Sequence, residues 1–435
     1  MKRKIIDDLI KWKENKNHKP LIIYGARQVG KTYIIKEFAK EYYENIYEIN
    51  FELSPEAKWI FDGSLNVNDL LIKLSASNTS VNIKAGKTLL FFDEVQKCPQ
   101  VLTSLKAFAL DKRFDVIVSG SMLGIIMDKV ASFPVGYVDD MTLRPMTFEE
   151  FLWANNYNDM LIEEFKKYFD NEQLVPEAIH QKLNELFLQY IVVGGMPEAV
   201  QTFIDTKNIQ DVIIVQKKIL KGYKNDIAKY ASNNIKEKVR ECYDAIPDQL
   251  AKENKKFQYK LVKVGGNARF FASSLGWISD SGFGFKVERL KTLDLPLRAY
   301  RDISSFKFYF IDTGLLLSLY EEDVQSNILQ GDLGVLKGGI FENIIAQSLL
   351  ANNMPIYYYR RDDKMEIDFV TYYKENIVPI EVKSSKNTKS ISLSRLLINK
   401  KSNVKYGIKL SMNNINCNND LIKCYPLYMV MFIKN

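Results

Sequence analysis

A glycine-rich octapeptide is the feature that most constrains the fold, and it reads Gly25-Ala26-Arg27-Gln28-Val29-Gly30-Lys31-Thr32. It follows an apolar run over residues 21–24 and precedes a helical pattern that starts at residue 33. Such a loop offers backbone N–H groups and the positive end of a helix dipole to phosphate oxygens. In this motif Lys31 reaches the β- and γ-phosphates and Thr32 ligates Mg²⁺. The sequence therefore predicts a P-loop unit that binds ATP with Mg²⁺.

A second apolar run, residues 88–92, ends in the acids Asp93 and Glu94. This pattern is typical of a parallel strand that is buried on both faces and meets the phosphates at its C-terminal end. We expect Asp93 to hold the Mg²⁺ shell and Glu94 to polarise the attacking water. The alternative is a buried strand that simply ends in solvated acids.

A third strand is expected over residues 114–119, and it ends in Ser119-Gly120-Ser121. Ser119 is placed where a side chain would sense the γ-phosphate. The same tripeptide also suits an ordinary turn or helix N-cap, so the pattern alone leaves both interpretations open.

The order of apolar segments predicts an α/β protein of several domains, since 435 residues leave room for roughly three. Residues 1–150 alternate strands and helices, which indicates a parallel sheet with helices on both faces. Residues 151–245 have helical patterns, and residues 246–320 suggest helices followed by a hairpin, as in a winged-helix unit. Residues 325–435 mix one helix with alternating strands.

Composition excludes several classes of protein. The cysteines (Cys98, Cys242, Cys417 and Cys424) lack metal-type spacing, and the only histidines are His18 and His180. This argues against a zinc site or histidine-based catalysis and for a reducing, cytoplasmic location. The sequence shows no signal peptide, and no apolar run approaches the roughly 20 residues that span a bilayer. The net charge of +7 permits a polyanionic partner without requiring one.

A basic stretch opens the winged-helix-like region and includes Lys255, Lys256 and Lys260. Winged-helix units often bind nucleic acid through a basic helix, so DNA or RNA is an expected partner of this region. A solvated lysine face on a packing module explains the same charges equally well.

The C-terminal segment contains a second group of charged residues. Glu366 and Asp368 alternate on one expected strand, and Glu381 and Lys383 on the next. An acid beside an acid-x-lysine is the arrangement of a Mg²⁺-dependent phosphodiesterase, in which Asp368 and Glu381 bind metal and Lys383 steadies water or phosphate.

Glu342, from the preceding helix, would complete this metal shell. The carboxylates of Asp368 and Glu381 share a face only if the turn at residues 374–376 pairs even with odd positions. Cross-strand ion pairs on a solvent-facing sheet are the alternative explanation.

Together these motifs resemble prokaryotic AAA-type ATPases with a C-terminal restriction-endonuclease-like, PD-(D/E)xK-like domain of unknown function. Further motifs that support the resemblance are Phe91-Phe92-Asp93-Glu94-Val95-Gln96, Pro145-Met146-Thr147-Phe148-Glu149-Glu150-Phe151 and Val193-Gly194-Gly195-Met196-Pro197-Glu198. The resemblance implies an AAA core, a winged-helix region and a nuclease-like tail. This chain departs from it at Gly136-Tyr137, where a Gly-Arg pair is common, which leaves Arg113 and Arg144 as substitutes for an arginine finger.

Two functions follow from these observations. The first is a Mg²⁺-dependent ATPase, able to form a homo-oligomer, whose nucleotide cycle controls a nucleic-acid-directed C-terminal domain. The second is an ATP-gated regulatory or binding protein whose nuclease-like domain is catalytically silent. A small-molecule kinase is disfavoured because the sequence offers no acceptor-binding base beyond Glu94.

Overall fold

The computed structural model describes residues 1–126, 132–321, 323–330, 337–361, 365–383, 390–398, 403–417 and 419–435. The chain forms two compact units. The N-terminal unit comprises Arg3–Arg144 and Asp280–Gly282, and the C-terminal unit comprises Met1–Lys2, Pro145–Ser279 and Phe283–Asn435. Every helix in the described ranges is too short or too polar to cross a membrane.

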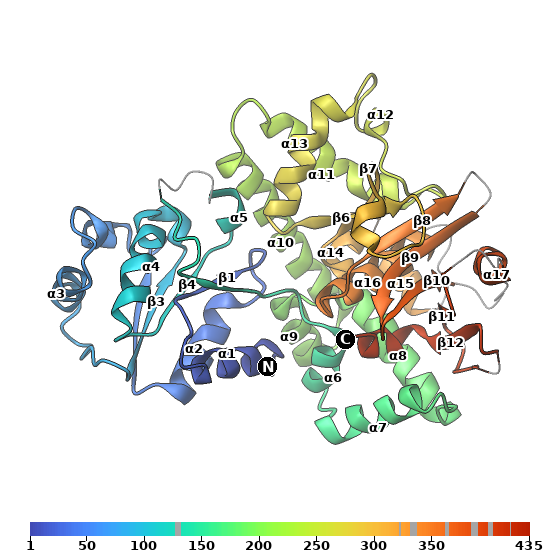
Figure 1. The fold of residues 1–435 in the computed structure, drawn as a ribbon, viewed down its shortest axis with the longest axis horizontal. Helices are drawn as coiled ribbons and strands as arrows, with labels where there is room; N and C mark the ends of the chain where they lie inside the picture. Colours follow the sequence, from blue (N-terminus) through green and yellow to red (C-terminus); the bar gives the residue numbers. More distant parts are fainter. Residues whose placement is uncertain are drawn as a thin grey trace. The chain divides into compact units, whose positions relative to one another are not determined.

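The N-terminal unit is built on a five-stranded sheet in the order β2-β3-β4-β1-β5, and all of its strand pairs are parallel (Figure 1). The strands are β1 (Leu21–Tyr24), β2 (Asn45–Asn50), β3 (Thr88–Asp93), β4 (Val116–Ser119) and β5 (Asp139–Thr142). Every side chain of β3 and of β4 is buried, as the continuous apolar runs predict for strands covered on both faces. The expected α/β class of this unit is therefore confirmed.

Helices cover both faces of this sheet. They are α1 (Ile5–Glu14), α2 (Lys31–Tyr42), η1 (Pro55–Phe61), α3 (Val67–Ser77), η2 (Val95–Lys97), α4 (Gln100–Asp111) and α5 (Leu123–Ile126). Phe92 and Val118 belong to a core cluster that also contains side chains of α3 and α4. The neighbouring side chain Phe91 points to the opposite face because strand side chains alternate, and the buried residues of α2, such as Phe38, lie outside that cluster.

The first part of the C-terminal unit is helical. Its helices are α6 (Phe148–Ala154), α7 (Asp159–Asp170), α8 (Glu177–Val193), α9 (Pro197–Thr206), α10 (Ile209–Tyr230), α11 (Lys236–Leu250), α12 (Tyr259–Val262) and α13 (Ala268–Asp280). The Thr147 and Glu150 side chains form a capping box at the start of α6, which fixes where the chain becomes helical after residue 146.

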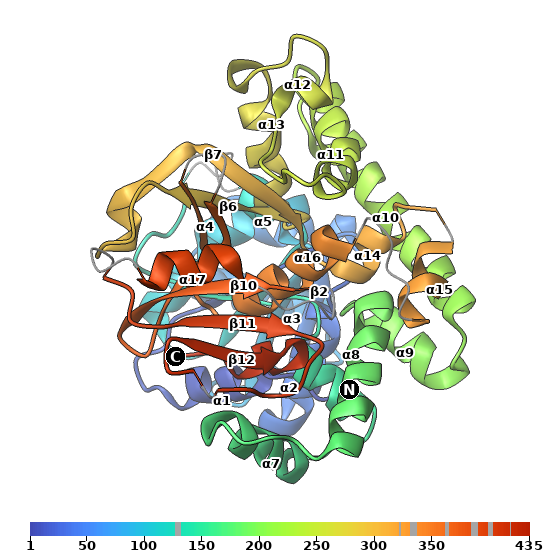
Figure 2. The same cartoon turned by 90° about the vertical axis from the view of Figure 1, so that its right-hand side faces the viewer.

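The second part is a seven-stranded mixed sheet in the order β12-β11-β10-β9-β8-β6-β7, and Figure 2 shows β10, β11 and β12 in this order. Its strands are β6 (Gly284–Leu290), β7 (Arg301–Phe310), β8 (Tyr357–Arg361), β9 (Met365–Tyr373), β10 (Asn376–Val382), β11 (Gly407–Ser411) and β12 (Ile422–Pro426). The remaining helices are η4 (Leu297–Tyr300), α14 (Thr313–Leu317), α15 (Asp323–Leu329), α16 (Lys337–Ala351), α17 (Ile391–Ile398) and η5 (Leu427–Phe432).

The sequence predicted that the β6–β7 hairpin would form the wing of a separate winged-helix unit, and the structure differs from this prediction. β6 pairs antiparallel with β7 on one side and parallel with β8 on the other, so the hairpin extends the C-terminal sheet. The division proposed between residues 320 and 325 thus falls between strands of one sheet. The helices α11 to α13 precede the hairpin, as predicted. The pairing of β6 with β8 could not be predicted from sequence patterns, because the two strands are far apart in the chain.

The two glycines of the 193–198 motif have a packing role. A Cβ on Gly195 would lie 2.2 Å from the backbone oxygen of Met146, and one on Gly194 would lie 2.3 Å from Oδ1 of Asp312. The Gly195 N–H donates to Oδ2 of Asp312 at 2.6 Å, and its carbonyl accepts from the Met146 N–H at 2.6 Å. This motif therefore joins the α8–α9 turn to the chain before α6 and to α14.

Candidate functional site

The predicted phosphate loop lies between β1 and α2 and has an unusual backbone. Gly25, Gln28 and Gly30 have positive φ angles of 149°, 66° and 92°. A Cβ on Gly25 would approach the backbone oxygen of Leu143 to 2.3 Å, so only glycine fits there. Ala26 and Val29 are buried, whereas Arg27 and Gln28 are exposed. The first N–H groups of α2 are thereby presented at the C-terminal edge of the sheet.

The Lys31 side chain is 6% exposed and folds back over its own loop. Its Nζ donates to the backbone oxygens of Gly25 at 2.8 Å and Ala26 at 2.9 Å. Arg3, which the sequence analysis did not identify, forms hydrogen bonds that hold the loop in place. Its guanidinium donates to the backbone oxygens of Val29 at 3.0 Å and Arg144 at 2.7 Å. An arginine near the chain start has no local motif that could have predicted these contacts.

Asp93 is the centre of a hydrogen-bond network at the end of β3, and it is 1% exposed. One carboxylate oxygen accepts from Thr32 Oγ1 at 2.7 Å and from Asn50 Nδ2 at 3.0 Å. The other accepts from Ser119 Oγ and from the Glu94 N–H. The strand order β3-β4-β1 brings these groups together, because β4 lies between the strand that precedes the loop and the strand that carries the acids.

Glu94 directly follows β3 and has a left-handed backbone with φ of 54°. Burial raises the pKa of its carboxyl, and the neighbouring Asp93 adds to this effect. Its Oε2 accepts hydrogen bonds from Gln96 Nε2 and, at 3.4 Å, from Ser121 Oγ. The sequence predicted Lys31, Thr32, Asp93, Glu94 and Ser119 as one site, and all five lie in the loop and strand ends of this unit.

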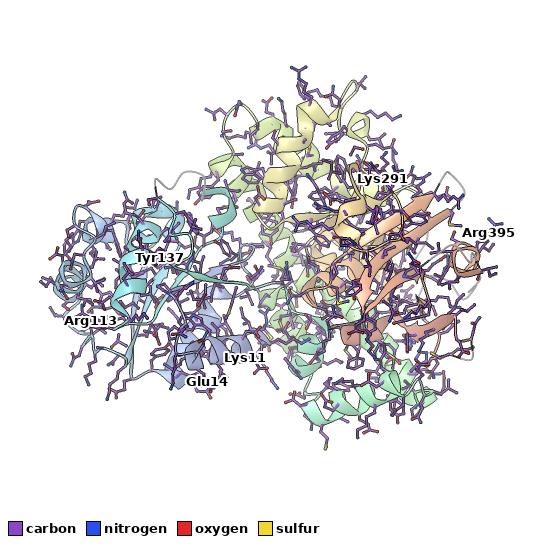
Figure 3. The ribbon with its side chains drawn as sticks, in the orientation of Figure 1. Lys11, Glu14, Arg113, Tyr137, Lys291 and Arg395 are labelled. Atoms are coloured by element: carbon purple, nitrogen blue, oxygen red, sulfur yellow. The ribbon has the colours of Figure 1, made fainter. Side chains whose placement is uncertain are left out.

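The two arginines considered as finger substitutes have other surroundings. Arg113, labelled in Figure 3, lies just before β4, at the N-terminal end of the strands, whereas the loop lies at their C-terminal end. It forms an ion pair with Asp111 at 2.7 Å. Arg144 follows β5, and burial lowers the pKa of its guanidinium. Tyr137, at the position of the departure from the family pattern, is partly buried in the turn before β5. Arg113 therefore cannot reach a phosphate on the loop of its own chain.

The C-terminal residues Asp368, Glu381 and Lys383 do lie together. In the β9–β10 pair Ile380 is opposite Phe369, which puts Glu381 opposite Asp368 on one face of the sheet. The Val382 N–H donates to Oδ2 of Asp368 at 2.8 Å, and Lys383 Nζ lies 2.5 Å from Oε1 of Glu381. The even-with-odd register required by the sequence prediction is thus present.

Glu342 is held by two lysines. Its carboxylate lies 2.9 Å from Lys255 Nζ and 3.1 Å from Lys307 Nζ, and Lys307 also pairs with Glu366 at 2.7 Å. Against the effect of burial, Lys307 and Lys255 lower the pKa of Glu342 to about 2. Burial, with Glu342 nearby, raises the pKa of Asp368 to about 7.

A metal shell that includes Glu342 is not evident in this geometry. Among the described residues no three His, Cys, Asp or Glu side chains are arranged to hold a metal ion. The metal-binding roles of Asp368, Glu381 and Glu342 stay predictions. Lys307, on β7, was missed because its strand was expected to belong to a different unit from Glu342.

Family models match three parts of the chain. A model described as an AAA domain matches residues 17–152. Models described as the domains of unknown function DUF8612 and DUF4143 match residues 184–326 and 337–430. The first match, together with the P-loop geometry, supports an AAA-type ATPase core, as the sequence predicts. Neither C-terminal model names a nuclease, so the restriction-endonuclease-like identity stays a prediction.

The chain is similar to two proteins that are described as uncharacterized and to a solved ATPase. An uncharacterized protein of Methanocaldococcus jannaschii is 30% identical over 221 residues, which are 50% of this chain and 44% of that relative. An uncharacterized protein of Haemophilus influenzae is 21% identical over 376 residues, which are 83% of this chain and 81% of that relative. A solved Walker-type ATPase of Pyrococcus abyssi is similar with a TM-score of 0.42 and 15% identity, covering 72% of this chain and 94% of its own.

Proposed function

We propose that the protein binds ATP and hydrolyses it. The observation that carries this proposal is the convergence of Lys31, Thr32, Asp93, Glu94 and Ser119 at one edge of the parallel sheet. A hydroxyl 2.7 Å from a buried carboxylate is a donor set that suits Mg²⁺, so Thr32 and Asp93 would hold the ion. When bound, Mg²⁺ supplies positive charge that offsets the phosphate oxygens.

The remaining residues have separate tasks. The Lys31 ammonium exchanges the carbonyls of Gly25 and Ala26 for phosphate oxygens, since phosphate is the stronger acceptor. Glu94 orients the attacking water and accepts its proton. The Ser119 hydroxyl, which donates to Asp93 in the structure, would respond to the γ-phosphate.

Substitutions at Lys31 and Glu94 test this division of tasks. We expect Lys31→Ala to lose ATP affinity, measured with a fluorescent nucleotide, because Lys31 meets ground-state phosphates. We expect Glu94→Gln to bind ATP normally but release phosphate about 10²- to 10⁴-fold more slowly, because the base acts in the transition state. Lys40→Ala and Glu41→Gln, on the exposed face of α2, are matched controls. Unchanged phosphate release in Glu94→Gln would remove Glu94 from the mechanism.

We further propose that the nucleotide cycle controls a nucleic-acid-directed C-terminal domain, with DNA or RNA as partner. The pairing of Asp368 with Glu381 beside Lys383 supports this proposal. The test is to incubate the protein with Mg²⁺, ATP and labelled DNA or RNA and to measure strand breaks. Asp368→Asn should abolish the breaks and leave phosphate release unchanged. Breaks that persist in Asp368→Asn would contradict a nuclease role for this cluster.

The lysines around Glu342 favour a second function, in which ATP gates a binding or regulatory domain without strand cleavage. Lys307 is 1% exposed and supplies a fixed positive charge between Glu342 and Glu366. Because these lysines offset the negative charge of the carboxylates, the cluster does not require a metal ion to balance that charge. Nucleic-acid binding that depends on ATP, without any strand breaks, would support this second function.

A further inference from the structure

The Glu94 carboxylate is anchored at one of its two oxygens. Gln96 Nε2 and Ser121 Oγ both donate to Oε2, and a second hydrogen of the Gln96 amide goes to Ser121 Oγ at 3.2 Å. Three side chains thus form a closed triangle of hydrogen bonds. No residue in the described part of the chain donates to Oε1 of Glu94.

The surrounding backbone is shaped to admit Gln96. Gln96 is 7% exposed and Ser121 is 5% exposed, so both side chains are fixed by packing. A Cβ on Gly120 would lie 2.3 Å from Oε1 of Gln96. Glycine at position 120 therefore makes room for the glutamine, and this explains the Ser-Gly-Ser sequence better than a generic turn does.

The orientation of the amide follows from its chemistry. A carboxylate accepts hydrogen bonds only, so the NH₂ group of Gln96 must face Glu94. Turning the amide over would place two oxygens against each other. In the observed orientation Oε1 of Gln96 is buried without a hydrogen-bond partner, which is energetically unfavourable. A side chain selected for packing alone would not need an amide here.

We propose that Gln96 and Ser121 are positioning residues, which fix Oε2 of Glu94 and leave Oε1 to accept the proton of the attacking water. This inference rests on the proposed ATPase function and assigns roles in that reaction to two further residues. Glu94 lies at the end of a strand, on a left-handed backbone position and without a helix-capping hydrogen bond, so the bonds from Gln96 and Ser121 fix its carboxylate.

The expected effect is on catalysis and not on binding. Gln96→Met keeps the volume of the side chain but removes the donor, so kcat should fall about ten- to a hundredfold, the factor of one hydrogen bond to a charged group. The affinity for ATP should stay unchanged, because the hydrogen bonds that the described structure gives to the Gln96 amide go to Glu94 and Ser121 and not to the loop. Ser121→Ala should have a smaller effect, since its bond to Glu94, at 3.4 Å, is long for a hydrogen bond between two oxygens. Gln100→Ala, an exposed glutamine at the start of α4, is the control.

A double-substitution cycle separates positioning from general damage. In the full chain carrying Glu94→Gln, adding Gln96→Met should not slow the residual single-turnover hydrolysis further, because there is no carboxylate left to position. The same loss in both backgrounds would show that Gln96 is merely structural. Wild-type protein that releases phosphate while Gln96→Met is unaffected would overturn the positioning role alone. A wild type that releases no phosphate would overturn the proposed ATPase activity as well.

Discussion

At the scale of single residues, Asp93 and Glu94 show how adjacent acids acquire different surroundings. Asp93 accepts hydrogen bonds from four donors, an arrangement that suits the carboxylate proposed to bind the metal ion. Glu94 takes a left-handed backbone, and burial raises the pKa of its carboxyl, which suits a group that must accept a proton. The two carboxylates have different surroundings because the chain leaves the strand after Asp93 and turns at the left-handed Glu94.

His18 provides a prediction on pH and stability. Its Nε2 lies 2.8 Å from Oδ1 of Asp115 and its Nδ1 lies 2.6 Å from the backbone oxygen of Asn15, so both nitrogens face acceptors. The hydrogen bond to Asp115 raises the pKa of His18, although burial opposes this. The stabilisation is then fully present below the unfolded pKa of about 6.5 and is lost as pH rises through the folded pKa.

We therefore expect His18→Gln to lower the melting temperature clearly at pH 5.5 and little at pH 8.5. Lys13 and Tyr43 also contact Asp115, and these contacts remain in the variant. Thermal denaturation of wild type and variant across this range is the measurement. An equal difference at both pH values would mean that His18 is neutral in the folded protein.

At the scale of elements, the basic segment that follows α11 and runs into α12 has two kinds of lysine. Lys255 has 11% of its side chain exposed and pairs with Glu342, so it is unavailable to a polyanion. Lys252 and Lys260 are exposed and Lys256 is partly exposed. The sequence analysis treated Lys255 like the neighbouring lysines, because its partner Glu342, on α16, is far away in the chain.

We expect the triple substitution of Lys252, Lys256 and Lys260 to Glu to weaken binding of DNA or RNA across sequences and to flatten its salt dependence. Filter binding at several salt concentrations tests this. Lys255→Glu should instead lower stability, because it leaves Glu342 facing another buried acid. Equal retention of nucleic acid by wild type and triple variant would favour the solvated-face interpretation.

At the scale of the whole molecule, the two compact units predict separate responses to nucleotide. A ligand bound at 100 times its Kd stabilises its site by about 2.7 kcal/mol, which corresponds to roughly 5–10 °C for a unit of this size. Calorimetry should therefore show two transitions, of which ATP with Mg²⁺ raises one. Lys31→Ala should abolish the shift. A single transition that moves as a whole would show that the units unfold together.

The sequence by itself determined the parts that depend on local order. The loop from Gly25 to Thr32, the acids that end β3 and the alternation in β9 and β10 are all encoded in short segments, because backbone geometry and strand period act over a few residues. From them came the α/β class and the P-loop site. The shared face of Asp368 and Glu381 was predicted only on condition of an even-with-odd register, which the structure supplied.

Only the tertiary structure decided which distant segments meet. It joined β6 to β8, placed Lys255 and Lys307 on Glu342, and brought Ser121 onto Glu94. None of these contacts has a local signal, since each depends on strand order and on packing across long stretches of chain. Charge balance in the C-terminal cluster and the hydrogen bond from Ser121 to Glu94 are therefore properties of the fold, because the groups that make them are neighbours only in space.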